Sequence, residues 1–563
     1  MREPRDGQSI AGEDDAVPEA LDPAIPIALA EAAAYPHDPS ARAGVRSIET
    51  HISHVFLTGE KVYKLHKAVD LGFLRFATRE ERNADCLREI QFNRRLAPDV
   101  YLGVAPIECE AQAAQVGSAS EELAAARRGA AAPEHCVVMR RLADGRDALS
   151  LLQAGQLGPT DIDCIAGRIA AFHLEHRLGA PAPFTEADWF ERVTGPAIRN
   201  FESLSGAGSI VARDAVEAAR SDTEAAAQRL AERFEARRRR GRAVEGHGDL
   251  HLQHVFLEPG RSEPRIIDCI TFNDDLRRID AAAEVAFPSM DLTYRGAPGL
   301  GARLLRRYAA LTDDFDLYGV VDFFISYRAA VRAKVAALAA LEPTIGAEQR
   351  EAAGASARRH LALARESLTP AKAAPIVLVG GAVGAGKSSV AETFAERFGG
   401  VIVSSDRTRK HELGVDPFDH SHAGDRGETY SDASRSRVYA GLLERTAPVA
   451  RSGRIAILDA TYGNRSHRDT ARALARELGV PIVFINAFCD PDEAARRVAA
   501  RQQRGVDASD AGPEIAVQSR ASFDALDEWP TDAQLRIRTD EPNWRERPWP
   551  LPNALTPFLR SER

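Results

Sequence analysis

The sequence is poor in cysteine and has no long apolar run. Six cysteines are scattered over 563 residues, and none of them forms a short CxxC spacing. This is weak evidence for a zinc site or a disulfide framework, and it favours reduced thiols in a cytosol. No stretch of about 18 uninterrupted apolar residues occurs, and the N-terminus lacks the apolar core of a secretion signal. We therefore expect a cytoplasmic protein without a membrane span.

The chain also lacks an excess of basic residues. Its 73 Lys and Arg against 82 Asp and Glu give a formal charge of −9 at pH 7. Nucleic-acid binding depends on basic surface that releases counterions, so a general affinity for nucleic acid is disfavoured, although a local basic groove is not excluded. The hydrophobic share of 44% is typical of globular proteins. The length predicts two or three domains.

Composition divides the chain into regions. Residues 1–35 are rich in Pro, Ala, Asp and Glu, which predicts a mobile tail. Residues 111–134 predict a surface insertion, and 343–375 predict a polar helix and a proline-bracketed linker. The remaining regions are a front domain over 36–342, a second domain over 376–545 and a C-terminal tail over 546–563.

The two domains differ in their pattern. In the second domain short apolar strands alternate with amphipathic helices, which predicts an α/β domain whose parallel sheet is covered on both faces. The front domain predicts an α+β fold, with a hairpin at Thr58-Gly59-Glu60, a helix over 79–96 and mainly helical patterns beyond residue 140. The expected strands of the second domain are 376–380, 401–404, 455–459 and 482–488, and its expected helices are 388–398, 433–449, 467–478 and 492–503.

The strongest motif is GAVGAGKSS, from Gly381 to Ser389, which follows a strand and opens a helix. Its glycines allow backbone N–H groups to converge on phosphate oxygens, helped by the helix N-terminus. Lys387 is expected to reach the β- and γ-phosphates of ATP, and the Ser388 hydroxyl to ligate Mg²⁺. The expected nucleotide-binding residues are Gly381, Gly384, Ala385, Gly386, Lys387, Ser388 and Ser389.

Further residues of the second domain carry a resemblance. Ser404-Ser405-Asp406 ends the second strand and Arg409 follows it, while Asp459 ends the next apolar strand. Over about 374–540 the chain resembles the small P-loop kinases that include gluconate kinase-like, zeta-toxin-like and polynucleotide-kinase-like enzymes. The resemblance implies that Asp406 is the general base and that Arg409 anchors the acceptor. Asp459 stands where a Walker-B-like carboxylate meets Mg²⁺ or its water shell.

Three arginines follow at helical spacing. Arg497, Arg501 and Arg504 share one face of the last expected helix. They resemble the lid arginines of this group, which close over the transferring phosphoryl and neutralise its charge. A solvated helix face is the alternative interpretation.

The front domain carries a second motif, GHGDLHLQHV from residue 246, followed by the strand-ending Asp268. A loop Asp followed some 20 residues later by a strand-ending Asp is typical of protein-kinase-like phosphotransferases. HGDLH resembles the aminoglycoside phosphotransferase family over about residues 45–335. The resemblance implies that Asp249 accepts the proton of the acceptor hydroxyl and that Asp268 holds Mg²⁺. Lys64 and Glu89 resemble the pair that orders the ATP phosphates, with Glu80 or Glu81 as alternatives to Glu89.

One position departs from that family. The family usually has Asn five residues after the loop Asp as a metal ligand, and this chain has His254 there. A neutral imidazole is a less usual Mg²⁺ ligand than a carboxamide oxygen. A glycine-rich GxGxxG is also absent from the front domain. The front domain is therefore expected to bind metal differently, to work slowly, or to bind nucleotide without catalysis.

The whole chain resembles bacterial fusions of an aminoglycoside-phosphotransferase-like domain with a P-loop kinase. We expect a bifunctional, ATP- and Mg²⁺-dependent phosphotransferase that acts on hydroxyl groups of small molecules. One alternative is a nucleotide-binding regulatory protein, in which a degenerate front domain controls an active P-loop kinase. Another is a polynucleotide 5′-hydroxyl kinase, which the charge disfavours. The sequence names neither acceptor and leaves the oligomeric state open.

Overall fold

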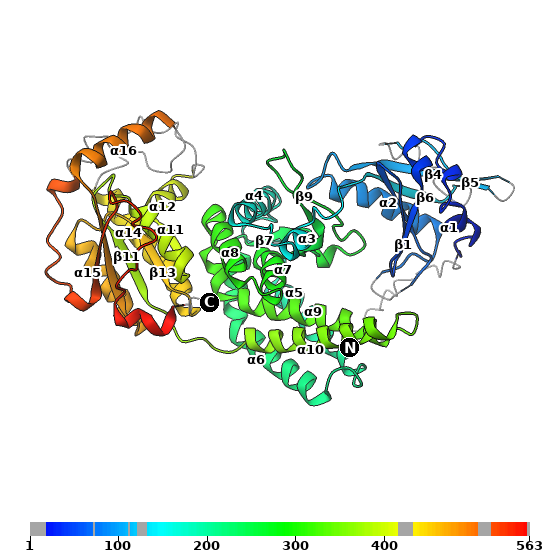
Figure 1. Cartoon of the computed structure of the whole chain (residues 1–563). Coiled ribbons are helices and arrows are strands. Elements are labelled where there is room, and N and C mark those ends of the chain that lie inside the picture. Colours follow the sequence, from blue (N-terminus) through cyan, green and yellow to red (C-terminus); the bar gives the residue numbers. More distant parts are fainter. Residues whose placement is uncertain are drawn as a thin grey trace, which may run out of the picture. The chain divides into compact units, whose positions relative to one another are not determined.

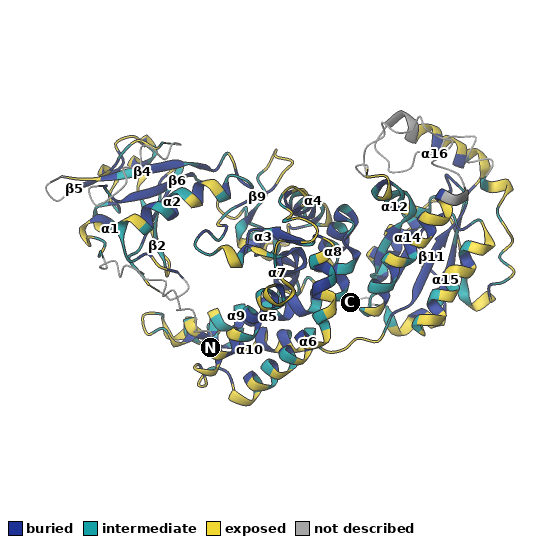
Figure 2. Ribbon diagram, turned by 180° about the vertical axis from the view of Figure 1, so that it is seen from behind, coloured by how far each residue is buried: buried dark blue, intermediate teal, exposed yellow. Residues whose placement is uncertain are grey.

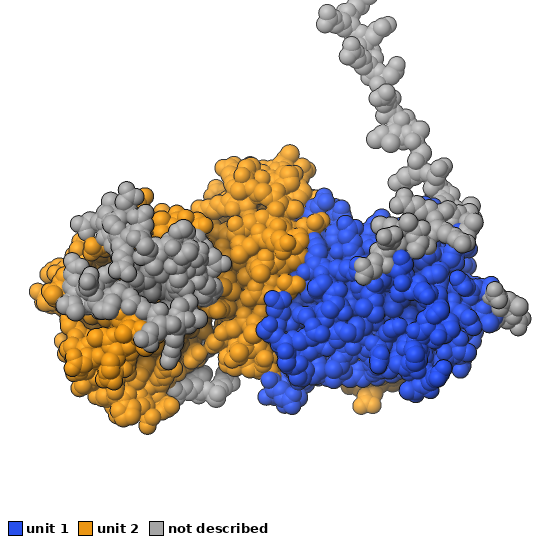
Figure 3. Space-filling view, turned by 90° about the horizontal axis from the view of Figure 1, so that it is seen from above, with its two compact units in different colours: residues 1–156, 247–278 blue, residues 157–246, 279–563 orange. Residues whose placement is uncertain are grey.

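The computed structural model describes residues 19–70, 74–110, 113–120, 132–414, 432–504 and 519–559. The chain folds into two compact units (Figure 3). The first unit combines Met1–Gln156 with His247–Arg278, and the second combines Leu157–Gly246 with Ile279–Arg563. Across the residues that are described, no helix is long and apolar enough to cross a membrane.

The first unit is built on a six-stranded antiparallel sheet with the order β1-β2-β3-β6-β4-β5. The predicted hairpin is present, because β2 pairs with β3 around Thr58-Gly59-Glu60. Helix α2 (Arg79–Asn93) packs on β4 and β6, and a reciprocal capping box between Thr78 and Glu81 fixes where it begins. The strands are β1 (Arg46–Glu49), β2 (Ser53–Leu57), β3 (Lys61–His66), β4 (Tyr101–Glu110), β5 (Ala113–Val116) and β6 (His135–Arg140).

Short elements complete the first unit and carry its polar loop. Helix α3 (Ala148–Gln153) packs on the 3-10 turn η4 (Leu252–His254), and β8 (Val255–Phe256) pairs with β9 (Arg265–Ile266). The other short elements are α1 (Ala24–Ala28), η1 (Ala32–Ala34), η2 (Pro39–Ala43) and η5 (Asp274–Leu276), and β10 (Arg278–Asp280) leads into the second unit.

Two expectations for the first unit were wrong. The predicted tail over 1–35 is not a tail from residue 19 on, since Ile25, Leu29 and Tyr35 are buried in the same core as Phe56. Apolar residues spaced along a Pro- and Ala-rich segment were enough for this packing. Part of the predicted insertion over 111–134 is also structural, because β5 pairs with β4 and buries Val116. Residues 1–18 and 121–131 lie outside the described residues.

The helical part of the second unit packs long helices in layers (Figure 1). Arg237 is buried there between the carboxylates of Asp280 and Asp314, with nitrogen–oxygen distances of 2.7 Å to each. Helix α10, which fills most of the predicted 343–375 segment, packs along α9 and against α6. The elements are α4 (Pro159–Glu175), α5 (Glu186–Ser205), α6 (Arg213–Arg239), β7 (Ala243–Glu245), α7 (Ala281–Tyr294), α8 (Pro298–Thr312), η6 (Phe315–Gly319), α9 (Val321–Leu341) and α10 (Ala347–Ser367).

The remainder of the second unit is the expected α/β domain. Its five strands are all parallel, with the order β12-β13-β11-β14-β15, so the strand before the GAVGAGKSS loop is central. Figure 2 shows β11 buried between helices whose outer faces are exposed. The strands are β11 (Ile376–Gly380), β12 (Val401–Ser404), β13 (Ala456–Asp459), β14 (Ile482–Phe488) and β15 (Gln534–Arg538), and the helices are α11 (Lys387–Phe398), α12 (Ser405–Glu412), α14 (Asp432–Arg451), α15 (Arg465–Leu478) and α16 (Pro491–Arg504).

The end of the chain was predicted incorrectly. Strand β15 was not expected, and the predicted tail over 546–563 is part of the core as far as it is described. Trp549 and Leu555, the latter in the 3-10 helix η8 (Asn553–Phe558), pack in one cluster with Val390 and Phe394 of α11. The two apolar side chains cover a sheet face that α11 alone leaves open. Residues 560–563 lie outside the described part of the chain.

The helical part and the α/β part are joined by ion pairs. Arg445 of α14 makes two contacts with Asp313, at 2.7 and 2.6 Å. Arg454 makes two with Asp322, at 3.0 and 2.6 Å. These pairs lie inside one compact unit, so the boundary expected near residue 375 is not a division between units.

Candidate functional sites

The glycine-rich loop wraps around the carboxyl end of β11. Gly381 and Gly384 have φ angles of 145° and 82°, a region that favours glycine. A Cβ on Gly381 would overlap the carbonyl oxygen of Ala487, and one on Gly384 would lie 2.7 Å from that of Ala494. Only glycine therefore fits, and the loop forms a backbone cradle of the kind that holds phosphates. The other predicted residues lie in the loop and the first turn of α11: Ala385, Gly386, Lys387, Ser388 and Ser389.

A lysine, a serine and a carboxylate meet beside this loop. Lys387 begins α11, and its Nζ donates to the carbonyl oxygen of Ala382 at 3.1 Å. Asp459, at the end of β13, is 6% exposed and accepts a hydrogen bond from Ser388. Burial raises the pKa of Asp459 to about 6, and the charge of Lys387 and the hydrogen bond from Ser388 offset this only in part. Hydroxyl and carboxylate oxygens fit Mg²⁺, which prefers hard oxygen ligands.

Asp406 and Arg409 lie at the same sheet edge, on α12. Ser404 at the end of β12 pairs in register with Asp459, which places the start of α12 next to it. The Arg409 guanidinium is 3.2 Å from the Asp406 carboxylate, and the negative charge of Asp406 adds to the raised pKa of Asp459. The structure thus brings Asp406, Asp459 and Lys387 together.

Tyr439 of α14 supports this edge of the sheet, a role that sequence reasoning missed. Its hydroxyl lies 3.0 Å from the Thr461 hydroxyl and accepts the backbone N–H of Tyr462 at 3.1 Å. Its ring stacks on His467 with centroids 3.8 Å apart. These contacts hold the segment that follows Asp459.

Of the three predicted lid arginines on α16, only Arg497 has a side chain that the structure describes. Arg497 donates to the Thr539 hydroxyl and carbonyl at 2.9 and 3.0 Å, and the Thr539 hydroxyl donates to the Ala385 carbonyl at 2.8 Å. Arg497 thereby links α16 to the glycine-rich loop. The side chains of Arg501 and Arg504 lie outside the described residues, so their lid role stays a prediction.

A cavity of about 500 Å³ lies next to the loop. Thr539, which bonds the loop at Ala385, is part of its wall. An indole, guanidinium groups and a carboxamide can contact a nucleobase and its ribose. The sequence did not suggest this cavity, because a large part of its wall follows strand β15, which was not expected. Its lining includes Arg496, Arg497, Thr539, Asn543, Trp544 and Arg545.

In the first unit, Lys64 pairs with two carboxylates. Its Nζ lies 3.0 Å from Glu89 Oε1 and 2.8 Å from Asp268 Oδ1. Against burial, these two charges hold the pKa of Lys64 well above its usual range. Glu81, the alternative acid, instead caps α2. The structure therefore brings Lys64, Glu89 and Asp268 together as the sequence predicted.

Buried polar groups hold Asp268 and Glu89 of this triad in position. Asp268 has a φ of 64°, and its N–H donates to the Tyr101 hydroxyl at 3.0 Å. Asn93 Oδ1 accepts the next backbone N–H, that of Cys269, at 2.8 Å. His66 lies between Asp85, at 3.2 Å, and Glu89, at 3.8 Å. Sequence reasoning missed these supports, whose residue types alone carry no signal.

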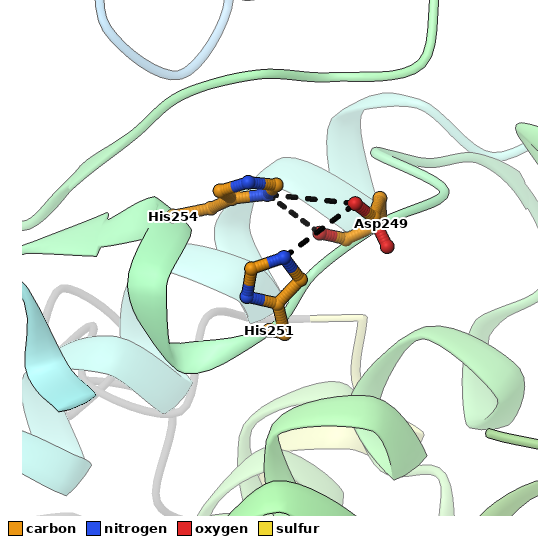
Figure 4. A group of neighbouring side chains, drawn as sticks. All are labelled: Asp249, His251 and His254. Carbon is orange, nitrogen blue, oxygen red and sulfur yellow. Dashed lines mark hydrogen bonds and ion pairs between the residues drawn. The ribbon is translucent and has the colours of Figure 1, made fainter. Parts of the chain in front are cut away.

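The loop Asp249 is surrounded by histidines. Figure 4 shows His251 and His254 facing Asp249. His254 Nδ1 lies 2.9 Å from the Asp249 carbonyl oxygen, and His251 Nε2 lies 3.6 Å from Asp249 Oδ2. Burial alone would raise the pKa of Asp249. A hydrogen bond and charge from His251, together with charge from His254, outweigh burial and hold this pKa well below its usual range. Burial lowers the pKa of His254 to about 4.

The two sites differ in their fit to Mg²⁺. Ser388 and Asp459 supply oxygen atoms alone. In the first unit, His254 Nε2 lies 3.5 Å from Asp268 Oδ2 and occupies the place of the expected carboxamide. This imidazole-containing set does not fit Mg²⁺.

Comparison with known proteins identifies one domain and several relatives of the whole chain. A family model described as an AAA domain matches residues 376–526. The chain thus combines a front unit that carries the Lys64–Glu89–Asp268 triad with a C-terminal α/β domain that carries a P-loop. Uncharacterized protein Rv2004c of Mycobacterium tuberculosis (strain H37Rv) is 33% identical over 484 residues, covering 83% of this chain and 88% of that protein. Uncharacterized protein Mb2027c of Mycobacterium bovis matches equally. The chain belongs to the family of these mycobacterial proteins.

Solved structures give more distant likenesses. A choline/ethanolamine kinase family protein from Mesorhizobium loti has 14% identity and a TM-score of 0.32, covering 60% of this chain and 98% of that chain. A gluconokinase from Sinorhizobium meliloti 1021 has 19% identity and a TM-score of 0.22, covering 34% of this chain and 91% of that chain.

Proposed function

We propose that this protein is a bifunctional ATP-dependent phosphotransferase, in which each half transfers the γ-phosphoryl of ATP to a hydroxyl group of a small molecule. The observation that carries the proposal is the meeting of Lys387, the Ser388–Asp459 pair and Asp406 at one end of a parallel sheet. A phosphate cradle, a metal-binding pair and a carboxylate base are the parts that phosphoryl transfer requires.

In the P-loop half, the backbone cradle and Lys387 would hold the ATP phosphates. Ser388 and Asp459 would hold Mg²⁺, which when bound neutralises charge on the phosphate oxygens. Asp406 accepts the proton of the attacking hydroxyl, and Arg409, 3.2 Å away, orients Asp406 and anchors the acceptor. The cavity around Trp544 takes the nucleobase.

The acceptor of the P-loop half is proposed to be a small polar metabolite. One arginine near Asp406 suits a single anionic or polyhydroxylated molecule, whereas a polynucleotide needs a basic groove with aromatic side chains for stacking. The two classes of acceptor can be compared directly. A 5′-hydroxyl oligonucleotide and a panel of sugar acids and polyols are offered to the protein, and the labelling of each is measured. Efficient labelling of the oligonucleotide, falling steeply with salt, would overturn this choice.

In the front half, Lys64 holds the ATP phosphates and is itself held by Glu89. Asp249 is an ionised carboxylate at neutral pH because its pKa is low, and it accepts the proton of the second acceptor. A regulatory front half, which binds nucleotide without transfer, is the second candidate. His254 in place of the expected carboxamide favours that candidate.

A metabolite screen distinguishes a bifunctional enzyme from a protein with a regulatory front half. Wild type, Lys387→Ala and Asp249→Ala are incubated side by side with extracted metabolites and labelled ATP. A bifunctional enzyme loses a different product in each variant. Loss of every product in Lys387→Ala, with none lost in Asp249→Ala, would make the front half regulatory.

A further inference from the structure

Three histidines, His247, His251 and His254, lie on the loop of Asp249, and the charges of all three act on its carboxylate. His254 is the best defined of them. Its Nδ1 lies 2.9 Å from the carbonyl oxygen of Asp249. A carbonyl oxygen can only accept a hydrogen bond, so Nδ1 carries the proton. The other ring nitrogen, Nε2, faces Asp268 Oδ2 at 3.5 Å.

The distance between His254 Nε2 and Asp268 Oδ2 distinguishes a hydrogen bond from a shared metal ion. A hydrogen bond from a charged imidazole to a carboxylate is about 2.7–2.9 Å long. Two ligands bound at about 2.0–2.2 Å to one tetrahedral ion lie about 3.3–3.6 Å from each other. The 3.5 Å between His254 Nε2 and Asp268 Oδ2 fits the second arrangement. The other oxygen of that carboxylate, Oδ1, already accepts from Lys64 at 2.8 Å.

Further donors lie on the same loop. His251 Nε2 is 3.6 Å from Asp249 Oδ2, and one ligand atom from each of Asp249, His251 and His254 lies within 4.8 Å of the others. Figure 4 shows His251 and the Nδ1 edge of His254 facing Asp249 from different sides, with His254 Nδ1 3.8 Å from Asp249 Oδ2. The Nδ1–H bond to a backbone carbonyl is also the support that metal-ligating histidines commonly have, because it fixes the ring orientation and tautomer.

A second cluster in the first unit does not carry such an inference. His66, Asp85 and Glu89 are close and buried. Their carboxylates are already engaged, since Asp85 accepts from Thr271 at 3.0 Å and Glu89 accepts from Lys64 at 3.0 Å. That cluster positions Glu89.

We propose that the front site binds a divalent transition-metal ion of the Zn²⁺ or Co²⁺ class in preference to Mg²⁺, with His254 Nε2 and Asp268 as ligands and with Asp249 and His251 completing the set. Imidazole nitrogen suits these ions, whereas Mg²⁺ selects oxygen. The proposal deepens the function proposed above and rests on it for the role of the ion, but the binding of the ion does not depend on phosphoryl transfer.

The test is a titration of the metal-free full-length protein with Co²⁺, without nucleotide. Visible absorption of bound Co²⁺ reports binding, and competition with Zn²⁺ and Mg²⁺ reports preference. We expect one equivalent of Co²⁺, displaced by stoichiometric Zn²⁺ and retained in millimolar Mg²⁺. His254→Asn should weaken Co²⁺ binding by more than about 10-fold. His251→Asn should weaken it less, and circular dichroism of both variants reports whether they fold.

Two controls locate the ion. His176→Asn makes the same substitution outside the site, where Nδ1 bonds the Phe172 carbonyl and the ring packs on that of Phe172, and it should leave binding unchanged. Ser388→Ala removes the P-loop metal ligand and should also leave binding unchanged. Absence of Co²⁺ absorption in the wild type, equal binding in folded His254→Asn, or displacement by Mg²⁺ would each overturn the proposal.

Failure of the metal proposal and failure of the proposed function are separable. Co²⁺ binding that needs His254, in a front half that transfers no phosphoryl group, supports the metal site and removes the catalytic function. Front-half turnover lost in Asp249→Ala, in a protein that binds no Co²⁺, supports the function and removes the metal proposal.

Discussion

The two sites of this protein are built from different parts of the chain. The P-loop site is mainly backbone, formed by consecutive residues whose glycines have no room for a Cβ. The front site is made of side chains from separate segments, with Lys64 on β3, Glu89 on α2, and Asp249 and Asp268 on later loops. A backbone cradle accepts few substitutions. A site made of side chains can carry His254 where the resembled family has Asn, and its other residues keep their positions.

The carboxylates proposed to bind metal, Asp459 and Asp268, also differ in charge compensation. Burial raises the pKa of Asp459 to about 6, because Lys387 and Ser388 compensate it only in part. At Asp268 the charge of Lys64, 2.8 Å away, outweighs desolvation and holds the pKa well below its usual range. The P-loop carboxylate is thus arranged for an incoming cation, while Oδ1 of the front carboxylate already pairs with Lys64 and only its Oδ2 faces His254.

The largest expected effect on activity is at the P-loop. Lys387→Ala removes an ammonium aimed at the charge that develops in phosphoryl transfer, which commonly costs about 3 kcal/mol, or about 100-fold in kcat. Steady-state turnover of the P-loop product measures it. Lys372→Ala, an exposed lysine before β11, is the matched control. Unchanged P-loop turnover in a folded Lys387→Ala protein would contradict the assignment.

The second effect is on stability and should separate the two lysines. Lys64→Met leaves the buried Glu89 carboxylate without its lysine partner, and we expect a loss of about 3–5 kcal/mol in the free energy of unfolding of the first unit. Lys387→Met should cost clearly less, because the charge of Lys387 offsets the burial of Asp459 only in part. Chemical denaturation of both variants measures the difference. Equal losses would show that the compensation argument is wrong.

The third effect concerns Asp459 and pH. The folded protein favours the protonated form of Asp459, so its ionisation lowers stability as the pH rises from about 4 to about 6. Asp459→Asn should therefore stabilise the metal-free protein at pH 7 by about 1–3 kcal/mol while lowering Mg²⁺-dependent turnover. Thermal melts between pH 4 and 7 measure it, and the advantage of the variant should shrink toward pH 4. An advantage that does not vary with pH points to a cause other than ionisation.

The smallest effect is expected at Tyr439. Tyr439→Phe leaves the backbone N–H of Tyr462 without its acceptor, which costs about 1 kcal/mol. A several-fold fall in P-loop turnover should accompany it, since the segment after Asp459 loosens. Front-half turnover in the same variant is the internal control. A fall of equal size in both halves would indicate a general loss of fold.

The sequence predicted the regular parts of the α/β domain well. Strands β11, β12 and β14 begin and end at the expected residues, because short apolar runs between helical patterns define them. Strand β15 was missed because QLRIR alternates polar and apolar residues and has no helix pattern after it. The same end of the chain supplies Trp544 and a large part of the cavity wall, so the cavity was missed as well.

The front site was predicted only as far as motifs reach. Lys64, Glu89 and Asp268 were expected together because their order along the chain resembles a known arrangement, and their distances agree. The roles of His66 and Tyr101 were not predictable, since they depend on which side chains the sheet brings behind the triad. The position of His254 between Asp249 and Asp268 likewise required the fold of the loop.

The central claim, that one chain carries two separate nucleotide sites, is tested most directly by nucleotide-binding stoichiometry. Isothermal titration of the full-length protein with a non-hydrolysable ATP analogue, in the presence of Mg²⁺ and Zn²⁺, counts the sites. The account predicts two equivalents for the wild type, one for Lys387→Ala, one for Lys64→Ala and none for the double variant. A single equivalent in the wild type that Lys387→Ala alone abolishes would contradict it.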